Sequence, residues 1–221
     1  MGISKQRAAQ NREAIIAAAE RLFRDRGVDA VGLNELMDAA GFTRGGFYNH
    51  FKSKGALVAA VLDKTMQDGA ATLAKSFSDA KAHRKDPLKA RIEEYLSPAQ
   101  RNDIEEGCPL TGFVGDVRRL DEFSREIYAH GLEANLKHLT TLFAESEADP
   151  AQARAKAIAA FSQMVGALLL SRAVQEVDPK LADEVLTLTR RDLLTPKAGV
   201  TSSNPIGRSI TPETHIAHRP R

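Results

Sequence analysis

One stretch of the 221-residue sequence combines several cationic side chains with a complete lack of acidic ones. The window Gly41–Gly55 contains Arg44, Lys52, Lys54 and His50, and neither Asp nor Glu. A local basic surface of this kind can bind phosphate groups on a protein that is otherwise nearly neutral, and the net charge of this chain is only +2. On charge alone, a solvated basic face explains the window at least as well.

The same window lies in a pattern of two short amphipathic helices joined by a tight turn. Gly41 can adopt the positive φ that such a turn needs, and Phe42 supplies an apolar plug between the helices. Thr43 is suited to N-cap the second helix through its hydroxyl. In a helix-turn-helix the second helix enters the major groove of DNA. We expect its outer face to carry Arg44, Gly45, Tyr48 and Asn49, and its inner face to carry Phe47 and Phe51.

These residues resemble a known family. The segment AAGFTRGGFYNHFKSKGAL, which begins at Ala39, is similar to the signature of the TetR family of bacterial transcriptional regulators, and AAE-x-LF-x-x-x-G over Ala18–Gly27 is similar to the first helix of that family. The resemblance covers about residues 10–65, and the later helices match only in general layout. Met37 departs from the pattern, because the family usually has a small residue there. We therefore expect a wider crossing of the two short helices.

The resemblance implies a repressor that binds palindromic operator DNA as a dimer and is released by a small-molecule or electrophile inducer. The DNA-binding residues that it implies are Thr43, Arg44, Gly45, Tyr48, Asn49, His50 and Lys54. Tyr48, His50 and Lys54 are expected to contact phosphates, and Thr43 can also reach one, which positions a protein without reading sequence. For Lys54, the start of the fourth helix adds backbone N–H groups that favour an anion.

Arg44 is the candidate reader of a base, through a bidentate contact to guanine that discriminates by roughly 1–3 kcal/mol. The alternative for Arg44 is a phosphate contact, and Tyr48 and His50 could be ordinary surface residues. Gly45 lets the helix backbone approach the base edges closely. An N-terminal arm with Lys5, Arg7 and Arg12 could reach flanking phosphates or the minor groove.

The single cysteine is the second candidate for chemistry. Cys108 lies in EEGCPLTGF, just before Pro109 and an expected helix start, where a thiolate is stabilised. Glu105 and Glu106 oppose that effect, and Arg118 or Arg119 could restore it only by folding back. The context resembles a TetR branch with a cysteine that senses electrophiles. The alternative is a small buried apolar residue.

The elements that must position these residues are all helices. Apolar residues recur with helical spacing from Ile15 onward, and the dipeptides Asp149-Pro150 and Asp178-Pro179 mark two long helix starts. We predict an all-α fold with a helix-turn-helix domain over residues 1–55 and a larger helical ligand-binding and dimerisation domain over residues 56–194. Residues 195–221 indicate a disordered tail, rich in Ser, Thr, Pro and Gly. Charge follows the same division, with net values of +3, −4 and +3.

The last two helices are expected to form the dimer interface, because their apolar surface is broad. The candidates are Ile158, Phe161, Val165, Gly166, Ala167, Leu168, Leu169 and Ser171 from one helix and Val185, Leu186 and Leu188 from the other. The alternative is that they fill the core of one chain. A ligand pocket in the middle helices could be lined by Phe113, Val117, Phe123, Tyr128 and Phe143, although such a stripe is more often plain core.

Composition limits the remaining classes. Mean hydropathy is −0.31, no stretch approaches the roughly 18 apolar residues of a membrane span, and the start lacks a secretory signal, so the cytoplasm is the default compartment. One cysteine excludes a multi-thiolate metal site, and no cofactor is expected. Nucleotide-binding and hydrolase motifs are missing, so we expect no enzyme. A helical adaptor that binds only protein has no need of the basic window.

Overall fold

The computed structural model describes residues 5–195, and this part of the chain contains helices and no strand. The all-α prediction is therefore confirmed. The helices are α1 (Lys5–Arg26), α2 (Leu33–Ala39), α3 (Arg44–Phe47), α4 (Lys54–Ala82), α5 (Pro87–Tyr95), α6 (Pro98–Asn102), α7 (Pro109–Val117), α8 (Glu122–Phe143), α9 (Pro150–Val174) and α10 (Pro179–Leu194).

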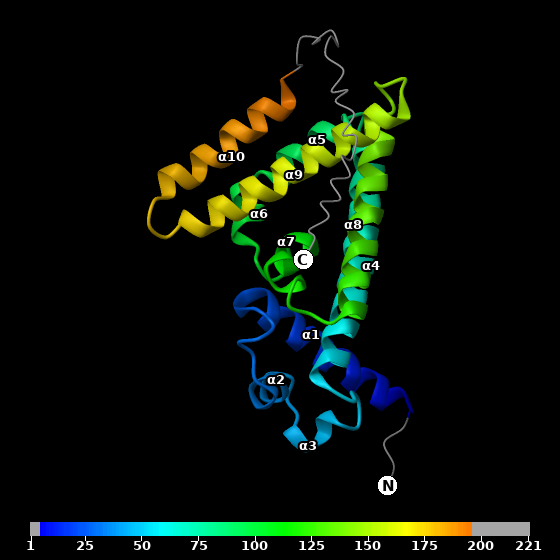
Figure 1. Ribbon diagram of the computed structural model, residues 1–221, viewed down its shortest axis with the longest axis vertical. Coiled ribbons are helices and arrows are strands. Elements are labelled where there is room, and N and C mark those ends of the chain that lie inside the picture. The colour runs from blue at the N-terminus through cyan, green and yellow to red at the C-terminus, as the bar shows by residue number, and fades with distance from the viewer. Residues whose placement is uncertain (1–4, 196–221) are drawn as a thin grey trace, which may run out of the picture.

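The helices form a small N-terminal unit and a larger upper body (Figure 1). The N-terminal unit comprises α1, α2, α3 and the first turn of α4. Helix α4 then leaves this unit and packs along α8, which packs against α9, and α9 packs against α10. Helix α7 lies in the middle of the molecule and contacts α1, so it joins the upper body to the N-terminal unit.

Side-chain caps fix most helix starts where the sequence predicts them. The carboxylates of Asp149 and Asp178 accept hydrogen bonds from the backbone N–H groups of Ala151 and Leu181, and proline follows each cap. Ser53 caps α4 by accepting from Ala56 N at 3.1 Å. The prediction that the Thr43 hydroxyl caps α3 is wrong, because Thr43 makes no side-chain cap bond and its carbonyl accepts instead, from Gly46 N at 2.9 Å.

Two glycines end helices in the left-handed region, as their positions predict. Gly27 ends α1 with φ +82°, and Gly41 ends α2 with φ +79°. Helix α4 runs without interruption to Ala82, and the segment between Ser97 and Pro109 contains the short helix α6.

The hydrophobic core is continuous from the N-terminal unit to the last helix. One cluster of buried side chains extends from Ile15 in α1 to Leu186 in α10. The predicted domain boundary after residue 55 falls within the first turn of α4, which runs on without interruption. The division into two domains at this position therefore remains a prediction.

Helix α9 is long and apolar enough, by length and composition alone, to cross a membrane. The expectation that no segment approaches this composition is therefore wrong. In the structure one side of α9 is core, since Ala157, Met164 and Leu168 are buried against neighbouring helices. The predicted C-terminal tail, with the arginines at 208, 219 and 221, lies outside the described residues apart from Thr195.

Candidate nucleic-acid interface and interior cavity

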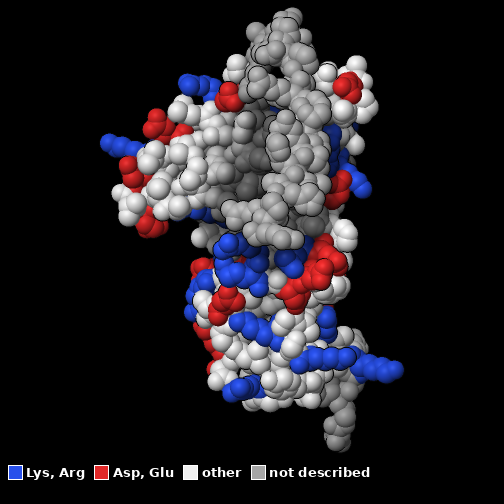
Figure 2. Space-filling view, in the orientation of Figure 1, with Lys and Arg blue, Asp and Glu red and all other residues white. Residues whose placement is uncertain are grey.

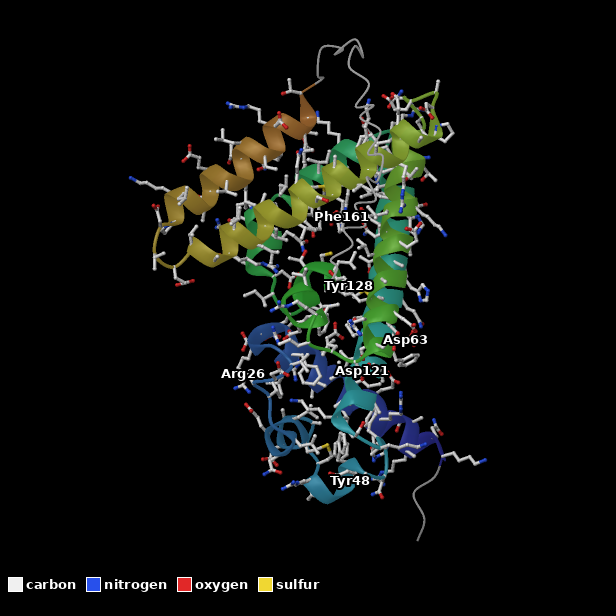
Figure 3. All side chains as sticks on the ribbon, in the orientation of Figure 1. Arg26, Tyr48, Asp63, Asp121, Tyr128 and Phe161 are labelled. Carbon is white, nitrogen blue, oxygen red and sulfur yellow. The ribbon has the colours of Figure 1, made fainter. Side chains whose placement is uncertain are left out.

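Helix α3 is held from the inside by aromatic packing. Phe47 is fully buried, and its ring stacks on Phe51 with centroids 5.7 Å apart. The Tyr48 ring meets the Phe47 ring edge-on at 5.3 Å and stays 65% exposed. Tyr48 lies at the end of the molecule opposite α10, on the outside of the N-terminal unit (Figure 3). The inner and outer faces that the sequence predicts for this segment are therefore the ones in the structure.

The polar residues of this segment are open to solvent. Thr43, Arg44, Gly45 and Asn49 are exposed, and His50 is half-buried. Helix α3 itself is a single turn, and the chain continues in tight turns in which the N–H groups of Asn49 and His50 donate to carbonyls one turn earlier. The segment is therefore more compact than a long recognition helix, but it presents its polar side chains on one outer surface.

Met37 fits at the crossing of α2 and α3 without crowding. Its side chain is fully buried, and a Cβ built on Gly46 would lie 3.9 Å from the Met37 Cε, which is ordinary van der Waals contact. The wider crossing that the sequence suggests remains a prediction.

Lys54 has a different environment from the one expected. Its ammonium donates to the carbonyl oxygens of Val28 and Val31, each at 2.6 Å, and lies 5.9 Å from the centre of the Phe23 ring. These carbonyls belong to the turn between α1 and α2. Lys54 thus joins α4 to that turn, and two of the three hydrogens of its ammonium group already donate hydrogen bonds within the protein.

We expect Lys54→Met to lower the melting temperature of the protein by about 3–6 °C, since hydrogen bonds to a charged group contribute about 1.5–3 kcal/mol when buried and less at a half-buried site. Lys52→Met, at an exposed position two residues earlier, is the matched control and should leave the melting temperature unchanged. The measurement is thermal unfolding by circular dichroism. If Lys54→Met instead leaves stability unchanged and weakens binding to all DNA sequences equally, Lys54 binds a phosphate, as the sequence predicts.

The predicted N-terminal arm is helical as far as the structure describes it. Helix α1 begins at Lys5 and includes Arg7 and Arg12, and the expected contact of these residues with flanking phosphates or the minor groove remains a prediction. The Arg12 guanidinium lies 4.9 Å from the centre of the Phe51 ring and pairs with Glu13 at 3.8 Å.

A cavity of about 820 Å³ lies between the N-terminal unit and the upper body. Its wall comes from α1, the end of α2, α4, α5, α8 and the segment that joins α6 to α7. Charged side chains of both signs gather around the waist of the molecule (Figure 2). Burial raises the pKa of Glu20, one of the lining carboxyls, while Arg24 and Lys64 act in the opposite direction.

None of the five residues that the sequence proposes for a pocket lines this cavity. Phe113 is fully buried in the core, Phe123 is 64% exposed on the surface, and Tyr128 donates to the Leu110 carbonyl at 2.6 Å. Aromatic residues in the sequence do not indicate this cavity, because small and charged residues form most of its lining. Two glycines make room for its inner wall, since a Cβ at Gly69 would lie 2.8 Å from Pro109 and one at Gly131 would lie 2.6 Å from the Met66 sulfur.

Cys108 lines the same cavity and is half-buried at the start of α7. Cys108 also packs against the hydrophobic core, so both the thiol sensor and the small buried apolar residue remain predictions. Arg119 does not turn back to it, because Arg119 pairs with Asp29 at 2.8 Å and with Asp116 at 2.6 Å. The basic neighbour of Cys108 is instead Arg172 from α9, which interacts with it electrostatically.

Two tyrosines surround the thiol. Tyr95 is fully buried and shares a hydrogen bond of 2.5 Å with the Thr111 hydroxyl. Burial raises the pKa of Tyr95 well above its usual value, and the neighbouring Cys108 adds to this. Burial likewise raises the pKa of Tyr128 to about 12, with a further contribution from Cys108. Both hydroxyls are therefore protonated at neutral pH and can donate hydrogen bonds. Within residues 5–195, no group of three side chains is placed to bind a metal ion.

The outer face of α9 is apolar and exposed. Ile158 and Leu170 are 42% and 62% exposed, and between them a Cβ added at Gly166 would have no atom within 4 Å. On α10, Leu181 and Leu188 are 42% and 41% exposed, two turns apart. Five of the proposed interface residues instead fill the core of this chain, namely Phe161, Ala167, Leu168, Ser171 and Leu186. The remaining ones are exposed or half-buried on α9 and α10.

An exposed turn-and-helix surface on an aromatic core, at one end of an all-helical body, defines a helix-turn-helix protein. Residues 15–61 match the family model described as bacterial regulatory proteins, tetR family. The likeness to this family is therefore carried by the N-terminal part of the chain. The HTH-type transcriptional regulator TtgR of Pseudomonas putida is 47% identical over 60 residues, which are 27% of this chain and only 29% of TtgR. The HTH-type transcriptional repressor NemR of Escherichia coli is 26% identical over 129 residues, 58% of this chain and 65% of NemR.

Solved structures show the same fold over most of the chain. The reduced form of E. coli NemR superposes with a TM-score of 0.71 at 21% identity, covering 84% of this chain and 95% of NemR. A TetR transcriptional regulator from Legionella pneumophila gives a TM-score of 0.66 at 21% identity, covering 87% and 99%.

Proposed function

We propose that the protein is a transcriptional repressor that binds a palindromic operator as a homodimer. The observation that carries this proposal is the exposed surface formed by Arg44, Tyr48 and Asn49 on a buried aromatic core. The likeness to named repressors supports it, and binding to chromosomal DNA would require a cytoplasmic protein. Thr43, Gly45 and His50 complete the contact surface.

The dimer is proposed from the outer faces of α9 and α10. Each protomer would contribute both helices to a four-helix bundle, which places two N-terminal units on a two-fold axis. Since one small unit makes few contacts to DNA, two half-sites about one helical turn apart, roughly 34–36 Å, supply the remaining affinity.

The effector is proposed to occupy the cavity between the N-terminal unit and the upper body. If the effector is an electrophile, Cys108 in the cavity wall is the residue that reacts with it. The thiolate sulfur would add to an electron-poor carbon–carbon double bond, forming an S–C bond while the neighbouring carbon takes up a proton. The half-buried position of Cys108 in the cavity wall, with the cationic Arg172 near it, supports this step.

The test is selection of binding sites from a random DNA pool by the purified full-length protein. We expect a two-fold symmetric site to be enriched, with an affinity that falls steeply as salt rises because several phosphates are neutralised. An adaptor or an enzyme would enrich nothing. Enrichment of a single unrepeated half-site would contradict the dimeric arrangement.

A further inference from the structure

Arg24 of α1 is a charged side chain buried between the N-terminal unit and the upper body. Only 8% of the residue is exposed, although its helix otherwise belongs to the N-terminal unit. Its aliphatic stem lies on α7, where a Cβ at Gly112 would be 3.3 Å from the Arg24 Cγ. Its guanidinium carbon lies 5.7 Å from the centre of the Phe113 ring. Arg24 therefore reaches across from one part of the molecule into the other.

The polar contacts of Arg24 reach into both parts. Its Nη1 donates to the Gly107 carbonyl of the upper body at 2.6 Å, and within α1 its Nη2 pairs with Glu20 at 2.8 Å. Its Nε is buried and has no hydrogen-bond partner within the described residues. A buried charge that leaves a donor unsatisfied costs free energy.

The segment before Gly107 is also held from the opposite side. Arg172 of α9 donates to the carbonyls of Gln100, Arg101 and Asp103, each at 2.9 Å. A Cβ on Gly107 would lie 2.3 Å from the Asp103 carbonyl oxygen, so no larger residue fits at this position without a shift of the backbone. The segment before Cys108 is thus fixed between an arginine of α9 and an arginine of α1.

An ion pair also links the two parts, but it lies in solvent. The side chains of Arg119 and Asp29 are 49% and 70% exposed, and exposed pairs of this kind contribute little. Of these two polar links, the buried hydrogen bond from Arg24 to the Gly107 carbonyl is therefore the stronger one. It connects α1 to the loop before α7 in the upper body.

We propose that Arg24 is the residue through which the state of the cavity reaches the N-terminal unit. Arg24, Gly107 and Cys108 all line the cavity, so an occupant or an adduct on the thiol displaces the Gly107 carbonyl from Arg24. The end of α1 then loses its anchor in the upper body. This inference rests on the proposed function for its biological meaning, while the coupling itself is independent of DNA.

The experiment uses N-ethylmaleimide as the probe, because Cys108 is the only cysteine of the chain. Hydrogen exchange of α1 amides is measured in the full chain before and after alkylation. We expect the last two turns of α1 to exchange at least about tenfold faster after alkylation of the wild type, since local opening controls exchange. In Arg24→Met these amides should exchange fast from the start and change less than about twofold on alkylation.

Arg21→Met is the matched control, because Arg21 lies on the same helix and also lines the cavity. It should respond to alkylation as the wild type does, and Cys108→Ser should not respond at all. If Arg24→Met does not fold by circular dichroism, Arg24→Lys replaces it. Arg24→Lys keeps the charge but reaches only one of the two acceptors, so its response should be intermediate.

A wild-type-like response of the folded Arg24 variant overturns the proposal, and so does an unchanged α1 in the alkylated wild type. DNA affinity measured on the same samples separates the two levels. The predicted exchange pattern without DNA binding would refute the repressor function and leave the coupling intact. DNA binding with no exchange response would refute the coupling and leave the repressor function intact.

Discussion

Gly166→Arg is expected to leave the protein monomeric and to weaken operator binding by at least about 100-fold, the gain that joining two binding units commonly provides. Gly166 lies on the outer face of α9, and nothing lies within 4 Å of the position of an added Cβ. The new side chain therefore fits the isolated chain but places a charge in the middle of the proposed interface. Sedimentation and a DNA shift assay measure the two effects.

The control is Lys156→Arg, an exposed position on α9 that already carries a charge. It should change neither the association state nor DNA affinity. The melting temperature of Gly166→Arg, measured at a concentration where the wild type is also monomeric, should match that of the wild type. A dimeric Gly166→Arg protein with normal DNA affinity would show that the outer face of α9 is not the interface.

Arg44→Ala is expected to relax the preference for one base pair in each half-site, with a loss of about 5- to 150-fold on the preferred sequence, equivalent to roughly 1–3 kcal/mol. Arg44 is exposed at the start of α3, and the bare backbone of Gly45 beside it permits a close approach to base edges. The measurement is competition between the selected operator and variants with each base pair replaced.

Tyr48→Phe is the comparison for Arg44→Ala, because it removes only the hydroxyl expected to contact a phosphate. It should weaken all sequences alike and leave the order of preference unchanged. If Arg44→Ala also weakens every sequence equally, Arg44 is a phosphate contact and another residue reads the base.

The N-terminal unit could be predicted from the sequence because its signals are local. Gly27 and Gly41 mark helix ends that need positive φ, and the alternation of Phe47, Tyr48 and Phe51 separates inside from outside over about one turn. The long helices are equally accessible, because cap residues followed by proline mark their starts. Thr43 is the exception, since suitability for capping does not guarantee that the hydroxyl turns toward the helix.

The cavity and its surroundings could not be predicted in this way. Its wall combines α1, α4 and the segment before Cys108, which are far apart in the sequence and carry no shared pattern. Lys54 and Arg24 bind backbone carbonyls of distant turns, and a carbonyl has no signature in the sequence. Packing places the aromatic residues proposed as a pocket either in the core, as with Phe113, or on the surface, as with Phe123.

The uninterrupted course of α4 has a mechanical consequence. A helix of 29 residues is about 43 Å long at 1.5 Å per residue, and α4 has its first turn inside the DNA-binding unit. A straight helix of this length tilts as a rigid body. A tilt of only about 5° about its C-terminal end therefore shifts its first turn by about 4 Å. In a symmetric dimer both ends would swing, which changes the spacing of the two DNA-contacting surfaces by enough to lose register with consecutive turns of the duplex.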